Sequence, residues 1–334
     1  MKAVVYRAFG PAQKVLSLET LPAPELASGE VRVALAYSGV NPSDVKARAG
    51  ARAGVTELPF PAIIPHSDGA GVITEVGEGV EPARVGQRVW IWNGQWQRAY
   101  GTAASEICLP QEQAVPMSDT VDFKTGAALG IPGLTACHTV FSGGEVSGKT
   151  VLVQGGAGTV GLLAVQLAKW GGARVIATCS AAARDRVLAA GADAVLDYSA
   201  TDLSDQIIAA NHGQLVNLIV EVEFGANAEV DAAVIAPNGR ITAYGSAKAM
   251  QPALPFYPLM FKAVTLEMAL VYLLTPTQRE AAIARLNRAL ETEALSVPVA
   301  KIFPLAEAAT AHEAVEGGDR KGVILLQTSE NPMK

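Results

Sequence analysis

The sequence predicts an α/β protein that combines a β-rich lobe with a doubly wound parallel sheet. Three observations support this fold class. The first third of the chain consists of short apolar runs separated by glycine and proline. From about residue 150, strand-like runs alternate with helical segments of about ten residues. A glycine-rich turn follows the first of these later strands.

Length and composition indicate a compact protein with two lobes. A chain of 334 residues exceeds what one ordinary core organises, so two domains are expected. Half of the residues are hydrophobic and 17% are charged, a balance that excludes a disordered chain. The formal net charge of −6, without basic clusters, argues against a nucleic-acid partner. No apolar run or signal peptide indicates a membrane, so we expect a cytoplasmic protein.

The three cysteines are expected to be buried apolar residues. Cys108, Cys137 and Cys179 are far apart and form no C-x-x-C pair, which excludes a disulfide framework and a zinc-ribbon spacing.

The two lobes differ in the order of their expected strands and helices. In the first lobe, strands are expected at 3–6, 15–19, 31–36, 70–77 and 85–90. In the second, strands are expected at 151–154, 174–178, 194–197, 215–222 and 240–244, and helices at 159–169, 181–190 and 203–211. The tail is expected to form helices at 277–290 and 305–315 and a strand at 322–327. We expect this tail to return to the amino-terminal lobe.

The glycine-rich turn predicts a dinucleotide site. Gly156-x-Gly158-x-x-Gly161 directly follows a strand and opens a helix. The first glycine permits the tight turn, Gly158 lets backbone amides approach a diphosphate, and Gly161 allows close packing of helix and strand. Thr159 and Val160 lie at the helix amino terminus, where free N–H groups and the helix dipole attract anions. The alternative is a glycine-rich turn without a ligand.

The segment after the second strand favours NADPH over NADH. An acidic residue about 20 residues after the turn would bind the ribose of NAD, but 177–181 contains no carboxylate. Arg184 is expected to pair with a 2′-phosphate, and Ser180 is expected to donate a hydrogen bond to it. The alternative for Arg184 is a solvated helix residue beside Asp185.

Four segments together resemble the zinc-independent medium-chain dehydrogenase/reductases. They are Gly39–Asp44, Asp68–Gly77, Gly130–Ala136 and the turn itself. Within that family, the sequence is most similar to the quinone oxidoreductase, or ζ-crystallin-like, group. The resemblance implies a GroES-like catalytic domain at 1–124, a Rossmann NADPH-binding domain at 125–262, and a return segment at 263–334 that completes the catalytic domain. It further implies a nicotinamide site near Asn41 and a homodimer.

The zinc-ligand positions of the alcohol dehydrogenase branch carry other residues here. The resemblance places its cysteine at Asn41, its histidine at Ser67, its glutamate at Asp68 and its third cysteine within 130–132. None supplies a thiolate or an imidazole, and His66, one position away, lacks a second ligand. No metal is therefore expected. A site without a Lewis acid suits acceptors whose developing charge is delocalised, namely quinones or enones.

The candidate catalytic residues lie in the expected loop 41–48. Asn41 is expected to orient the substrate or the nicotinamide ribose. Lys46 stands where related quinone reductases have a tyrosine, so it is a candidate to stabilise an oxyanion or donate a proton, or else it is solvent-exposed. Asp44 is expected to pair with Lys46 or Arg48, either in the site or as a loop-fixing ion pair.

Further cofactor contacts are carried over from the family. They are Thr135, Tyr198, Asn227, Gly245 and Ser246. Aromatic residues before Gly101 line either an acceptor pocket or the core, and they are Trp90, Trp92, Trp96 and Tyr100.

The resulting hypothesis is an NADPH-dependent reductase of quinones or other conjugated acceptors. Two alternatives stay open: an alkenal or enoyl reductase acting on an activated C=C, and a non-catalytic NADPH-binding protein.

Overall fold

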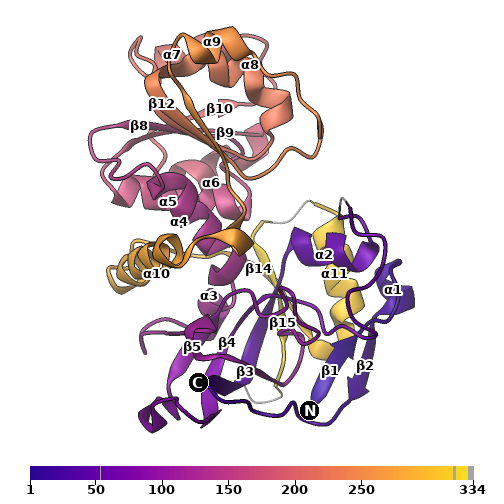
Figure 1. Ribbon diagram of the computed structural model, residues 1–334. Coiled ribbons are helices and arrows are strands. Elements are labelled where there is room, and N and C mark those ends of the chain that lie inside the picture. The colour runs from indigo at the N-terminus through magenta and orange to yellow at the C-terminus, as the bar shows by residue number, and fades with distance from the viewer. Residues whose placement is uncertain (53, 319–320, 330–334) are drawn as a thin grey trace. The chain divides into compact units, whose positions relative to one another are not determined.

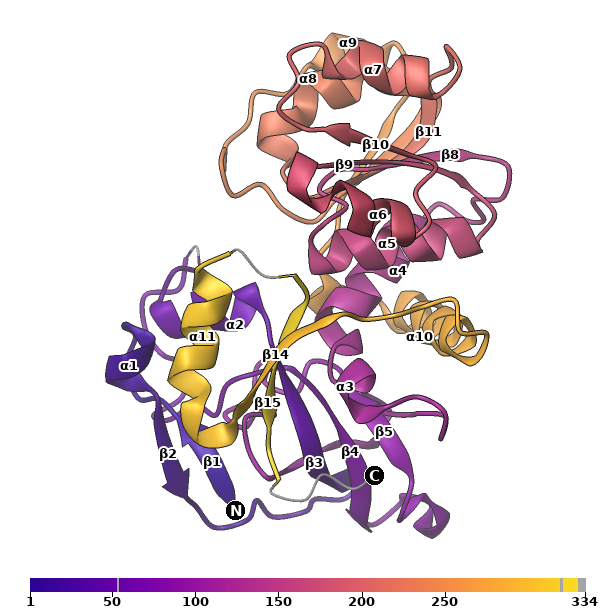
Figure 2. The ribbon, with the colours of Figure 1, turned by 180° about the vertical axis from the view of Figure 1, so that it is seen from behind.

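The chain forms two compact units, drawn in Figure 1 and from behind in Figure 2. The computed structural model describes residues 1–52, 54–318 and 321–329. Unit 1 holds residues 1–131 and the chain from Val297 onward, and unit 2 holds Pro132–Ser296. One unit contains a mixed sheet and the other a parallel sheet, which confirms the expected α/β fold class.

Unit 1 is built on a seven-stranded sheet and a small two-stranded sheet. The larger sheet has the order β14-β15-β3-β4-β5-β7, and β6 also pairs with β3. Its pairs are antiparallel except for the parallel pair of β14 and β15. Val31, Val33 and Leu35 alternate along β3 and are buried, as expected where one face of a sheet packs on a core. The strands are β1 Lys2–Val5, β2 Ser17–Thr20, β3 Glu30–Val40, β4 Asp68–Val76, β5 Arg88–Ile91, β6 Glu106–Pro110, β7 Ala114–Pro116, β14 Val299–Pro304 and β15 Val323–Gln327.

The carboxy-terminal segment returns to unit 1. Strand β15 pairs with β3, with Ile324 opposite Val40. Helix α11 contacts α1 and α2, and α2 and α11 lie side by side in both views (Figures 1 and 2). The helices of unit 1 are α1 Ala12–Val15, α2 Pro42–Ala49, α3 Phe123–Gly126 and α11 Ala308–Glu316.

Unit 2 is a Rossmann fold. Its six strands are parallel and have the order β10-β9-β8-β11-β12-β13, which is 3-2-1-4-5-6 in chain order. Helices α4, α5 and α6 cover one face of the sheet, and α7, α8 and α9 cover the other (Figure 1). The strands are β8 Thr150–Val153, β9 Arg174–Cys179, β10 Ala194–Asp197, β11 Val216–Glu221, β12 Ile235–Ala243 and β13 Thr265–Met268. The helices are α4 Leu134–Phe141, α5 Thr159–Trp170, α6 Arg184–Ala189, α7 Leu203–Ala210, α8 Phe224–Val234, α9 Phe256–Met260 and α10 Pro276–Glu291. Among these and the other described helices, none has the length and apolarity of a membrane span.

The units differ in extent from the expected domains. The sequence placed the boundaries after 124 and 262, whereas the chain divides after 131 and 296. The second difference arises because β13 continues the parallel sheet beside β12, with Thr265 opposite Arg240. Residues 263–296 therefore belong to the Rossmann unit and not to the return segment.

Six of the described α-helices were not expected from the sequence, namely α1, α2, α3, α4, α8 and α9. The segment 41–48, expected as a loop, forms α2, because Pro42 presets the backbone at the first helical position. Helices α4 and α8 were also missed. In α8, Gly225 and Asn227 suggested a turn, but Phe224 and Ala228 are buried at helical spacing and tertiary packing overrides that local preference. The strand expected at 15–19 is present as β2, but it begins at Ser17, because α1 extends to Val15.

Candidate functional site

The glycine-rich turn connects β8 to the amino terminus of α5 and leaves backbone N–H groups free. The first N–H groups of a helix have no partner within the helix. No side chain caps α5, since the N-cap position is Gly158. Gly158 N–H donates to Gly155 O at 3.1 Å, which closes the turn. The amides of Thr159, Val160 and Gly161 therefore remain available to an anion.

Gly158 and Gly161 differ in whether the fold itself requires glycine at that position. A Cβ on Gly161 would lie 2.2 Å from the carbonyl oxygen of Gly155, so the fold itself requires glycine there. A Cβ on Gly158 would meet only Gly155 O, at 3.5 Å, which is an ordinary contact. Gly158 also has φ −70°, a conformation that any residue adopts. Because neither packing nor backbone demands glycine at 158, the space beside it fits a ligand.

The residues expected at the 2′-phosphate lie near the end of β9. Ser180 is exposed, and Tyr198, expected as a further cofactor contact, has 55% of its surface exposed. Arg184 is exposed at the start of α6, as in the alternative, and its guanidinium donates to Val195 O on β10. Two cations were missed from the sequence. Arg186 Nη2 donates to the carbonyl of Ala157 in the turn at 2.9 Å. Lys248 Nζ lies 5.8 Å from the centroid of the Tyr198 ring.

The other expected cofactor contacts of unit 2 lie at strand and helix ends. Gly245 and Ser246 follow β12, and Ser246 Oγ accepts from Gly225 N at 2.9 Å. Asn227 is one turn into α8 and donates to both carboxylate oxygens of Glu221, at 3.0 and 3.2 Å. Thr135 is buried in the first turn of α4. Gly245, Ser246 and the glycine turn follow the carboxyl ends of parallel strands, where such sheets bind ligands.

In unit 1, Asn41 is held between two buried carboxyl groups. Asn41 N–H donates to Asp44 Oδ2, and Asn41 Nδ2 donates to Asp68 Oδ2, both at 2.8 Å. Asp68 Oδ1 accepts from Ile131 N at 2.8 Å. Burial raises the pKa of Asp44 to about 7. Burial, and then the nearby charge of Asp44, raises the pKa of Asp68 well above its ordinary value. The amide of Asn41 is therefore fixed in one orientation.

The ion pairs expected for Asp44 are not formed. Asp44 caps its own helix through Asn41 instead. Arg48 pairs with Glu316 on α11 and also donates to Gly10 O, because it points to the opposite side of α2 toward the returning helix. Lys46 is exposed on the surface of unit 1.

His66 belongs to a buried chain of hydrogen bonds. The Thr102 hydroxyl donates to the Asp68 carbonyl at 2.6 Å, so Ser38 must donate to Thr102 at 2.8 Å. His66 Nδ1–H then donates to Ser38 at 2.9 Å, and His312 Nε2–H donates to His66 Nε2 at 2.8 Å. Both rings are thereby neutral with defined tautomers. Burial lowers the pKa of both, and that of His312 falls to about 3.

The positions that correspond to the zinc ligands of the alcohol dehydrogenase branch hold polar or closely packed residues. Ser67 and Asp68 are buried, and a Cβ on Gly130 would lie 2.3 Å from Asp68 Oδ1. His66 is not the lone histidine expected from the sequence, because Nε2 of His312 lies 2.8 Å from its Nε2. Among the described residues, no group of three or more His, Cys, Asp or Glu side chains is arranged to hold a metal ion.

The four aromatic residues before Gly101 do not share one environment. Trp90 is fully buried in the core of unit 1, whereas Tyr100 is exposed. Trp92 Nε1 donates to Glu112 O at 3.1 Å. The Arg52 guanidinium lies 5.9 Å from the centroid of the Trp96 ring. Core packing therefore accounts for Trp90.

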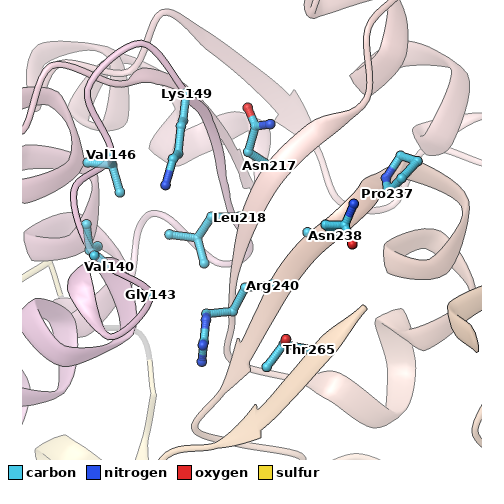
Figure 3. A pocket seen from close by; sticks show the side chains of 12 residues that line it. Val140, Gly143, Val146, Lys149, Asn217, Leu218, Pro237, Asn238, Arg240 and Thr265 are labelled. Atoms are coloured by element: carbon cyan, nitrogen blue, oxygen red, sulfur yellow. The ribbon is translucent and has the colours of Figure 1, made fainter. Parts of the chain in front are cut away.

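One pocket of unit 2 lies away from the glycine turn (Figure 3). It has a volume of about 250 Å³ and is lined by the amino ends of β11, β12 and β13, at the opposite edge of the sheet from the turn. Lys149 and Arg240 border it from two sides. Arg240 also pairs with Glu267 at 2.7 Å. The pocket is therefore separate from the expected dinucleotide site.

Comparisons with known proteins agree with this architecture. Residues 27–119 match the alcohol dehydrogenase GroES-like domain, and residues 159–288 match the zinc-binding dehydrogenase family. The quinone oxidoreductase of Rattus norvegicus is 29% identical over 332 residues, which is 98% of this chain and 97% of the relative.

Solved structures of the same architecture also align over the whole chain. One is a crystal structure of an NAD-dependent alcohol dehydrogenase, with a TM-score of 0.87 and 29% identity over 98% of this chain and all of that one. Another is a mycobacterial protein solved with NADPH, with a TM-score of 0.84 and 28% identity over 98% of this chain and all of that one. The order of the two matched domains, the strand order of unit 2 and this full-length likeness together show that the chain belongs to the medium-chain dehydrogenase/reductase family of oxidoreductases.

Proposed function

We propose that this protein is an NADPH-dependent, zinc-independent reductase that transfers hydride to quinones or other conjugated acceptors. The observation that carries the proposal is the uncapped amino terminus of α5 beside Gly158, where packing leaves room for a diphosphate. Full-length likeness to a quinone oxidoreductase and to a structure solved with NADPH supports it.

The choice of NADPH over NADH rests on charge near the end of β9. The segment 177–181 has no carboxylate to repel a 2′-phosphate. Arg184 and Arg186 both lie on the helix that follows, and Arg186 already contacts the turn. Tyr198 and Lys248 add a phenol and an ammonium group nearby. This set suits an additional phosphate better than a bare ribose hydroxyl.

Reduction adds a hydride and a proton to the acceptor. NADPH, when bound, supplies the hydride with its electron pair and leaves as NADP⁺. In unit 2, the turn amides and the cations near β9 would hold the dinucleotide. In unit 1, Asn41 would present its fixed amide to the acceptor or the nicotinamide ribose, and Lys46 would stabilise the oxygen that gains charge and deliver the proton.

A panel of acceptors tests the proposal. NADPH oxidation is expected with simple quinones, and little is expected with NADH or with alcohols. Turnover of enals or enoyl thioesters without quinone turnover would favour the alkenal or enoyl reductase. Tight NADPH binding without turnover of any acceptor would favour the non-catalytic binding protein. Metal analysis of active protein is expected to find no stoichiometric zinc, and stoichiometric zinc would contradict zinc independence.

We further propose that the protein is a homodimer joined through the edge of the Rossmann sheet. Strand β13 ends the strand order of unit 2, and an edge strand offers unpaired backbone groups. Met268 and Leu273 have 66% of their surfaces exposed, and Phe261 has 80%. Sedimentation equilibrium is expected to give twice the chain mass, and a monomer at micromolar concentration would contradict it. The cytoplasmic location stays a prediction.

A further inference from the structure

A buried string of polar side chains runs beneath the glycine turn of unit 2. It comprises Gln154 after β8, Thr178 on β9, Asp231 on α8 and Glu221 at the end of β11. All four have at most 1% of their surface exposed. Buried polar groups cost free energy unless each is paired, so a string of four in the core of a Rossmann sheet calls for a specific role.

The hydrogen bonds of this string run in one direction. Gly155 N–H can only donate, and it donates to Thr178 Oγ1 at 3.1 Å. The Thr178 hydroxyl hydrogen therefore goes to Gln154 Oε1, at 2.7 Å. This orients the amide of Gln154, whose Nε2 donates to Asp231 Oδ1 at 3.1 Å. Each bond is thus fixed by the one before it, starting at the turn.

The string ends in two carboxyl groups, Asp231 and Glu221, that hold one proton. The two carboxyl groups are buried and lie close enough to influence each other's ionisation, and because two charges are disfavoured together in a buried site, one of the two is protonated. Glu221 accepts from Asn227 Nδ2 and from the backbone of Glu223, which favours its ionised form. Asp231 Oδ2 has no donor among the described residues, so it is the oxygen that carries the proton. Burial, and then the charge of Glu221, raises the pKa of Asp231 well above its ordinary value.

Thr178 joins this string to the turn by two bonds. Its hydroxyl accepts from Gly155 N, and its backbone carbonyl accepts from Gly156 N at 2.8 Å. The first two glycines of the turn are therefore held by one residue whose hydroxyl orientation depends on Gln154 and Asp231.

We propose that Asp231 is a neutral carboxylic acid that acts as a positioning residue for the dinucleotide turn, through Gln154 and Thr178. The inference rests on the proposed function, since it takes the turn to be the dinucleotide site. It adds that NADPH affinity depends on a proton held at a side chain that does not touch the dinucleotide.

Matched threonine variants test the positioning role. Thr178→Val keeps the shape but removes the hydroxyl, so Gly155 N and Gln154 Oε1 lose their partner. The control is Thr242→Val, because Thr242 is fully buried in the same sheet and its hydroxyl has no partner among the described residues. The dissociation constant for NADPH is measured by titration calorimetry at a temperature where circular dichroism shows all variants folded. Thr178→Val is expected to weaken binding about tenfold or more, and Thr242→Val less than about twofold.

Asp231 variants test the proton. In Asp231→Asn, the amide is neutral and can accept from Gln154 as the neutral acid does, so affinity is expected to stay near that of the wild type. Asp231→Leu removes this bond and is expected to bind as weakly as Thr178→Val. In the wild-type-minus-Asp231→Asn infrared difference spectrum at pH 8, the carbonyl stretch of a protonated carboxylic acid is expected.

Three results would overturn the inference. They are equal NADPH affinity of the two threonine variants, loss of affinity in Asp231→Asn to the level of Thr178→Val, and absence of the acid band from the difference spectrum. If the wild-type protein itself fails to bind NADPH, the proposed function fails instead, and the infrared measurement still decides whether Asp231 is protonated.

Discussion

Substituting Gly158 by alanine tests dinucleotide binding separately from the stability of the fold. The added Cβ would lie 3.5 Å from its nearest neighbour, Gly155 O, so the turn accepts it without movement. The φ of −70° suits alanine as well as glycine. Gly161→Ala is the contrasting variant, because its Cβ would lie 2.2 Å from the carbonyl oxygen of Gly155 and must push helix and turn apart.

The two variants differ in their expected energies. Replacing glycine by alanine at a compatible backbone stabilises by about 0.4–1 kcal/mol, and the loss of glycine at an N-cap offsets about as much. The stability of Gly158→Ala is thus expected to stay within about 1 kcal/mol of wild type, whereas overpacking in Gly161→Ala costs about 1–3 kcal/mol or more. A methyl group that displaces the diphosphate from one amide costs about 1.5–3 kcal/mol of binding, or about 10- to 150-fold in Kd.

Urea unfolding and NADPH titration calorimetry measure the two quantities on the same samples. The expected pattern is a Gly158→Ala protein as stable as wild type that binds NADPH at least about tenfold more weakly. Wild-type affinity in Gly158→Ala would refute the placement of the diphosphate at this turn.

Three further outcomes follow from the two units. Asp44→Asn keeps the helix cap but removes a carboxyl group whose pKa burial raises to about 7. The free energy of unfolding of the wild type should therefore fall relative to that of the variant by about 4 kcal/mol as pH rises from about 4 to 7. A difference in urea unfolding that does not depend on pH would contradict this. Nitrogen-15 NMR at pH 7 should find His66 as the neutral Nδ1–H tautomer and His312 as the neutral Nε2–H tautomer, and any other pair of states would break the hydrogen-bond chain. Substituting Arg184 or Arg186 by alanine should weaken NADPH more than NADH, and equal losses for both nucleotides would remove that arginine from the phosphate site.

The parallel sheet and its glycine turn were predictable because both are encoded locally. Apolar runs of strand length, each followed by a helical period, specify the crossover units, and Gly156, Gly158 and Gly161 mark the first βα turn. Strand β13 was missed as part of this sheet, since its pairing with β12 depends on a contact between distant segments. The short helices α2 and α8 were missed because glycine, proline and asparagine near their starts resemble loop signals.

The candidate site was predictable in its residue types but not in its contacts. Asn41 and Asp44 were named from the sequence, yet the partner that fixes Asn41 is Asp68, which comes from another strand. The sequence predicts that Asp44 pairs with a nearby cation. In the structure, Arg48 instead pairs with Glu316, which lies 268 positions later in the sequence. Arg186 had a local signal, its position two residues after Arg184, but its contact with the turn depends on the orientation of α6. Such contacts are set by tertiary packing, and periodicity carries no information about them.

A crystal structure of the protein with NADPH tests the central claim most directly. The account predicts diphosphate oxygens within hydrogen-bonding distance of the amides at 158–161, and the 2′-phosphate beside the cations that follow β9. A dinucleotide bound elsewhere in the molecule, with that turn left bare, would contradict it.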